Sequence, residues 1–171
     1  MRRWLALATL ISIAVSRCAP LPGSVEGVQL RAGVRSNLDP NRWLTTQAAI
    51  NWPPNHGVAG MPMPEVLPPG TLIDRFGSDD GNFFSPVGTS YSKRALPYVC
   101  LQQAYTVYRV ISPLPVWVGH TAPWFDQPGD ATQFETDSSA ARMIRDAVIV
   151  PIKRDAPGLE APDRPCEPST N

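Results

Sequence analysis

The sequence has few of the side chains that most hydrolytic and metal-dependent sites use. Its 171 residues include two histidines and three cysteines, and these do not fall at the spacings of a zinc site. A Gly-x-Ser-x-Gly nucleophile motif is also absent. A structural zinc domain and a serine hydrolase are therefore poor interpretations. The acidic turn "SDDGN" lacks the full set of calcium ligands, so we interpret it as a plain turn.

The sequence also lacks charge of a dominant sign. Fifteen basic residues balance fifteen acidic ones, and neither kind forms a run. Proteins that bind nucleic acid or anionic membranes present clustered positive charge, so we expect neither partner here. Beyond the first twenty residues no segment is apolar enough to cross a bilayer, and we expect no stable membrane insertion.

The first residues have the pattern of an export signal. Arg2 and Arg3 precede an apolar run from Trp4 to Val15, which suits a signal-peptide core and is too short to span a membrane. We expect a signal peptide over residues 1–19 and a secreted, extracellular protein. A lipid-modified Cys18 is the alternative, although the Arg17 before it suits that processing poorly.

Two cysteines remain after such a cleavage, Cys100 and Cys166. Exported proteins commonly pair two cysteines, so a disulfide between them is expected. The alternative is a buried thiol at Cys100 and an unpaired tail residue at Cys166.

Proline is abundant instead. Twenty prolines disfavour long helices and favour loops and short strands. "TLIDRFG", "VCLQQAYTVYRVI" and "VIVPI" have strand character, "PLPVWVGHTAPW" suggests an edge strand, and "SSAARMIRDAV" suggests a helix capped by Asp137. We predict a compact α+β domain with a twisted mixed or antiparallel sheet, long Pro/Gly-rich loops and few short helices. It spans residues 51–152, between a lead-in at 20–50 and a Pro-rich tail at 153–171.

Two arginines at the mouths of loops are candidates for binding phosphate. Arg75 ends a predicted strand, and Arg94 precedes "ALP". A guanidinium stays charged and its fork matches phosphate oxygens. From the residues alone, surface ion pairs with the fifteen acids are the favoured interpretation of both arginines.

The order of several blocks narrows these alternatives. "WPPNHG", "LPPGTLIDRFGSDDGNFFSP", "KRALP", "YTVYRV", "PLPV" and "APWFDQPGDATQF" follow one another, ahead of a short helix and a strand. This order resembles the TNT domain family, named for the tuberculosis necrotizing toxin and including secreted fungal NAD glycohydrolases. The resemblance implies cleavage of the nicotinamide–ribose bond of NAD or NADP. It implies no cofactor, because the dinucleotide is the substrate, and no metal at the reacting bond. An immunity protein in the producing organism is an expected partner of a toxin of this kind.

The resemblance also implies roles for particular residues. Gln133 in "ATQF" and Arg75 in "DRFG" are expected to be catalytic, with Gln133 beside the reacting ribose. Arg94 in "RALP" is expected at the diphosphate, and Phe83 at an aromatic position of the pocket. Tyr105 is expected to contact the substrate as well.

The loop that carries "APWFDQPGDATQF" is expected to frame the nicotinamide end of the pocket. Trp124 would form a wall of the pocket by stacking. For Phe125 we favour the other interpretation, in which the ring is a core plug that anchors the loop.

Three positions depart from the family pattern. Asp130 and Ala131 stand where members often have glycine, and Thr106 stands where some have histidine. A side chain at a position of positive φ is strained. Two other functions therefore stay open: a TNT-fold binding module that has lost catalysis, and an ADP-ribosyltransferase.

Overall fold

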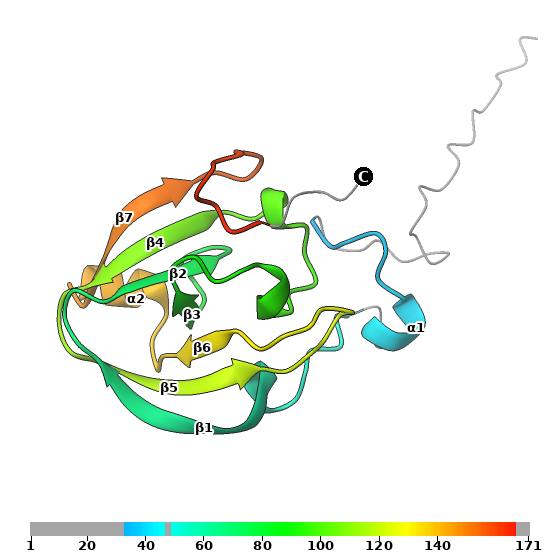
Figure 1. The fold of residues 1–171 in the computed structure, drawn as a ribbon, viewed down its shortest axis with the longest axis horizontal. Coiled ribbons are helices and arrows are strands. Elements are labelled where there is room, and N and C mark those ends of the chain that lie inside the picture. Colours follow the sequence, from blue (N-terminus) through cyan, green and yellow to red (C-terminus); the bar gives the residue numbers. More distant parts are fainter. Residues whose placement is uncertain (1–32, 47–48, 167–171) are drawn as a thin grey trace, which may run out of the picture.

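A single antiparallel sheet organises the protein. The computed structural model describes residues 33–46 and 49–166, and within them seven strands are ordered β1-β5-β6-β3-β2-β4-β7 (Figure 1). Every pairing is antiparallel, and the helices are short, which confirms an antiparallel sheet with few short helices. The strands are β1 Val58–Leu67, β2 Leu72–Phe76, β3 Phe83–Pro86, β4 Tyr105–Val110, β5 Leu114–Thr121, β6 Thr132–Glu135 and β7 Ile149–Asp155; the helices are α1 Pro40–Trp43 and α2 Ala140–Arg145; the 3-10 turns are η1 Asn55–Gly57, η2 Ser92–Arg94 and η3 Cys100–Gln102.

The sheet curves around α2, which lies inside the curve in Figure 1. Ala140 and Met143 of this helix are buried against the main apolar cluster, which includes Ile73, Phe84 and Tyr108. The predicted cap at Asp137 was wrong. The side chain of Ser139 caps α2 instead: Thr136 is still bonded to Asn82 of the neighbouring segment, and the helix begins only at Ala140.

The segment around Leu114–Thr121 is a central strand, so the predicted edge strand was wrong. β5 pairs with β1 on one side and with β6 on the other. β6 pairs with β5 only between Trp117 and His120 of β5. Pro115 lies outside this paired segment, so its missing N–H interrupts no hydrogen bond to β6. The edges of the sheet are β1 and β7.

The strand predicted around "VCLQQAYTVYRVI" is half correct. β4 begins only at Tyr105, and Cys100–Gln102 forms a 3-10 turn. The carbonyls of Cys100 and Gln103 accept bonds from Arg164, so they are satisfied without a neighbouring strand.

Part of the lead-in packs on the long loop between β5 and β6. Leu38 and Trp43 form a buried cluster with Phe125, which is fully buried. Trp43 Nε1 donates to Asp126 at 2.7 Å. Phe125 is therefore a core plug, as expected. The predicted signal peptide lies outside the described residues, and within those that are described no helix is long and apolar enough to span a membrane.

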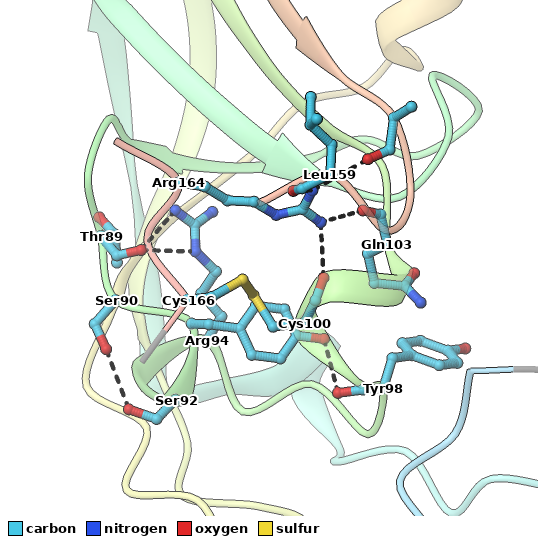
Figure 2. The surroundings of a disulfide bond; sticks show 12 residues. Thr89, Ser90, Ser92, Arg94, Tyr98, Cys100, Gln103, Leu159, Arg164 and Cys166 are labelled. Carbon is cyan, nitrogen blue, oxygen red and sulfur yellow. Dashed lines mark hydrogen bonds between the residues drawn. A yellow bond between two sulfur atoms is a disulfide. The ribbon is translucent and has the colours of Figure 1, made fainter. Parts of the chain in front are cut away.

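The C-terminal segment folds back and is held by a disulfide (Figure 2). Cys100 and Cys166 are bonded across 66 positions of sequence, which confirms the expected pair. Arg164, which is 5% exposed, donates to the carbonyls of Leu159, Cys100 and Gln103 beside it. β7 runs to Asp155, three residues past the expected domain end, before this segment begins.

We predict that removing the disulfide lowers stability substantially. A cross-link that closes a loop of this length contributes about 4 kcal/mol on the chain-entropy model. Cys166→Ser, or reduction of the wild type, should shift the denaturant midpoint down by a corresponding amount. Reductant should leave the midpoint of the Cys100→Ser/Cys166→Ser double variant unchanged, and equal midpoints for oxidised and reduced wild type would contradict the prediction.

Candidate functional site

A cleft with two adjoining hollows opens beside β3 and β6. Both hollows are lined by Trp52, Phe83, Arg94, Leu96, Thr121 and Gln133. One, of about 290 Å³, adds His56 and Glu135, and we refer to it as the glutamate hollow. The other, of about 440 Å³, adds Arg75 and Tyr98, and we refer to it as the arginine hollow. The shared lining makes them one continuous site.

Strand β6 supplies polar groups to the cleft by simple alternation. Gln133 and Glu135 line the cleft, and Phe134 between them is buried in the main core. Phe83 of β3 pairs directly with Glu135, so its ring stands on the same face. Gln133 Nε2 donates to the carbonyl of His56 at 3.0 Å, which fixes the orientation of the amide.

Arg75 reaches the arginine hollow where the pairing of two strands ends. The pairs between β2 and β3 stop at Asp74 and Ser85, one residue before Arg75. The guanidinium lies 5.7 Å from the ring of Phe84. A Cβ added at Gly81 would lie 2.1 Å from its Nη2 atom, so this glycine leaves the space that the side chain occupies.

Arg75 is a buried cation with unused donors. It is 8% exposed, and its Nε and Nη1 atoms have no hydrogen-bond partner among the described residues. Burial lowers the pKa of its guanidinium, while Tyr108, Asp79 and Asp80 act in the opposite direction. An arginine nevertheless remains charged at any ordinary pH. The arrangement therefore favours an anion in the arginine hollow.

Arg94 is held in place by a buried carboxylate. Its Nη2 atom lies 2.6 Å from Oδ1 of Asp74, which is fully buried. Nε and Nη2 also donate to the carbonyl of Thr89, at 3.1 and 2.8 Å. Burial raises the pKa of Asp74, whereas Arg94, Tyr105 and the Gly88 amide act to lower it. The guanidinium of Arg94 is thus held in a fixed orientation at the cleft, and Asp74 offsets part of its charge.

The structure brings four of the six predicted site residues together: Arg75, Phe83, Arg94 and Gln133. Tyr105 does not reach the cleft. Its ring packs on Phe76, and its hydroxyl donates to Asp74 at 2.8 Å, so it supports Arg94 from below.

Trp124 is also outside the lining of the cleft. Phe125 and Asp126 adopt left-handed backbone conformations and turn the loop toward the lead-in. The indole of Trp124 packs at a tilt against Trp43, with the ring centroids 5.3 Å apart, and donates to the carbonyl of Asn51.

Sequence reasoning gave no role to Trp52, His56 and Glu135, which line the cleft. A period of two along "TQFE" would have placed Glu135 on the face of Gln133. "WPPNHG" was one of the blocks that carry the family resemblance, but nothing in it indicates a contact with β6. His56 Nδ1 lies 2.8 and 2.9 Å from the two carboxylate oxygens of Glu135, 79 positions further on.

The departures beside Gln133 are accommodated by the backbone. Asp130 has φ of 66°, and aspartate tolerates this left-handed region better than most residues. Ala131 is buried and donates its amide to Thr121 Oγ1 at 2.9 Å. Thr106 is buried in β4 and pairs with Arg75.

No group of three or more histidine, cysteine, aspartate or glutamate residues is placed to hold a metal ion within the described part of the chain. The cleft instead combines two arginines, an amide, a carboxylate and aromatic rings. These are groups suited to an anionic organic molecule with polar rings.

The fold and the cleft define a small antiparallel β-sheet protein with a preformed cationic site. Comparison with known families places it further. The model of the family described as "Tuberculosis necrotizing toxin" matches residues 66–152, and the chain belongs to this family.

Individual relatives were also found. The chain is 40% identical over 91 residues to the conidial surface nicotinamide adenine dinucleotide glycohydrolase nadA of Aspergillus fumigatus. The match covers 49% of this chain and 39% of that protein, so the chain spans about two fifths of the relative's length. Among solved structures, it is similar to tuberculosis necrotizing toxin complexed with its immunity factor (24% identity, TM-score 0.49, 61% of this chain and 62% of that one). It is also similar to Rhs1-CT in complex with its cognate immunity protein (17% identity, TM-score 0.45, 61% and 88%).

We predict that Asp74→Asn destabilises the protein by about 3 kcal/mol, because it leaves the charge of Arg94 buried without its partner. Tyr105→Phe should cost less, about 1 kcal/mol, for one hydrogen bond. Urea unfolding measures both. Asp80→Asn at an exposed turn is the matched control and should change the free energy of unfolding by less than about 0.5 kcal/mol. An Asp74→Asn variant as stable as this control would show that the ion pair does not hold the site.

Proposed function

We propose that the protein is a secreted NAD(P) glycohydrolase, which hydrolyses the nicotinamide–ribose bond to give nicotinamide and ADP-ribose or its phosphate. Membership of the family and the activity in the name of the fungal relative support this function. Three observations support secretion: the leader pattern, the disulfide, and a relative named as a conidial surface protein.

The observation that carries the proposal is the unsatisfied guanidinium of Arg75. Two of its donors have no partner among the residues that the structure describes, and a buried cation in this state is costly unless a ligand completes its bonds. A diphosphate does so, because its oxygens accept the fork of an arginine. Arg94 lines the same hollow, so two guanidiniums are available to one diphosphate.

The rest of the cleft suits the two ends of a dinucleotide. Phe83 and Gln133 line both hollows, next to the arginines. We assign Phe83 to a ring of the substrate and Gln133 to the reacting ribose, where its amide both donates and accepts. Nicotinamide in NAD leaves as a neutral molecule and needs no protonation, so positioning and electrostatics supply much of the acceleration.

The alternatives make different products. A binding module would retain NAD without releasing nicotinamide. An ADP-ribosyltransferase would release nicotinamide and leave ADP-ribose attached to a protein. An immunity protein stays a prediction, and a toxin that depletes NAD in another cell would give the producer a need for one.

Gln133→Ala should lower kcat for NAD by roughly 100-fold, as loss of a preorganised group at the reacting centre does. Its KM should change less. Nicotinamide release by the purified protein, with NAD or NADP, measures both constants. Wild-type protein that leaves both dinucleotides intact would overturn the proposed function. Wild-type activity in Gln133→Ala would overturn only the role of that residue.

Gly81→Ala tests Arg75 without touching the arginine itself. The new methyl group would overlap the guanidinium, so Arg75 must leave its position. We expect KM for NAD to rise and kcat to fall, because a displaced diphosphate misaligns the ribose. Ser78→Ala in the same exposed turn is the control and should retain full activity. An unchanged Gly81→Ala enzyme would show that Arg75 does not bind substrate where the structure places it.

A further inference from the structure

The cleft contains a carboxylate to which neither the sequence nor the family comparison assigned a role. Glu135 lines the glutamate hollow, two residues beyond Gln133 on the same face of β6. Its side chain is 17% exposed. Among the described residues that line the two hollows it is the one acid, facing a site that otherwise contains two arginines.

This carboxylate is held by the same residue that holds Gln133. The ring of His56 contacts both oxygens of Glu135, and the backbone carbonyl of His56 accepts from Gln133. His56 itself has a left-handed backbone with φ of 52°, in a turn that precedes β1. A strained residue that fixes two polar side chains on one side of a cleft indicates a site rather than a chance surface contact.

The charge of Glu135 matches a need of the proposed reaction. Breaking the nicotinamide–ribose bond leaves positive charge on the ribose, as in glycoside hydrolysis. The positive charges of Arg75 and Arg94 suit the diphosphate, but they disfavour positive charge on the ribose. A carboxylate beside Gln133 offsets them at the reacting end.

We propose that Glu135 is a further catalytic residue of this cleft and that His56 is its positioning residue, an inference that rests on the proposed glycohydrolase function. The bond between C1′ and the nicotinamide nitrogen breaks, and its electron pair neutralises the ring. Water bonds to C1′ and passes a proton to Glu135, which releases it to solvent. Glu135 also stabilises the positive ribose before water attacks.

Glu135→Gln tests the charge, because glutamine is isosteric and still accepts a bond from His56. We expect kcat for NAD to fall by roughly 100-fold with little change in KM. His56→Ala should cost about tenfold, since the carboxylate remains but is no longer fixed. Glu65→Gln, at an exposed position of β1 away from the cleft, is the matched control and should match the wild type.

Azide separates a catalytic carboxylate from a structural one. It attacks C1′ without a proton to lose, so azide should restore nicotinamide release by Glu135→Ala at least tenfold and yield ADP-ribosyl azide. It should not accelerate Gln133→Ala. A Glu135→Gln enzyme as fast as wild type, or Glu135→Ala that azide leaves unchanged, would overturn the inference while wild-type turnover upholds the proposed function. Wild-type protein without turnover would overturn both.

Discussion

The buried ion pair between Asp74 and Arg94 is the contact on which the cleft depends. Asp74 lies in the middle of β2, whereas Arg94 comes from the irregular segment after β3, which has no ladder of its own to fix it. The carboxylate also accepts from Tyr105 of β4 and from the amide of Gly88. One side chain thus joins two strands and a loop. A cation held this way needs no rearrangement to meet an anion, and this preorganisation is what binding and catalysis use.

The regular elements were predictable where local pattern and tertiary environment agree. The strand at Leu72–Phe76 follows from its β-branched and aromatic residues, and the helix at Ala140–Arg145 follows from its helical spacing. The strand predicted at "VIVPI" is β7. The predictions for 99–104 and for the position of β5 failed for a common reason. Both depend on partners distant in sequence, Arg164 in one case and β1 in the other. The local sequence of one segment does not indicate such distant partners.

The site was predictable only where resemblance to a family indicated which residues come together. Arg75, Arg94, Phe83 and Gln133 come from different elements, and no spacing in the sequence brings them together. Trp124 shows the limit of chemical reasoning from residue type. An aromatic ring in a loop can bind a substrate or pack in a core equally well. Here the turn at Phe125 directs the ring of Trp124 to Trp43. The alternation of the strand could have placed Glu135 on the face of Gln133. Its contact with His56 could be found only from the structure.

The prolines that disfavoured helix in the sequence also lie at both margins of the sheet. β1 carries Pro62 and Pro64, and β7 carries Pro151. A proline nitrogen has no hydrogen to donate, and proline in an edge strand is one of the features that disfavour pairing with a strand of another molecule. Open margins are where β-proteins add strands to one another and aggregate. The prolines of β1 and β7 therefore disfavour the addition of a further strand at either margin of this sheet.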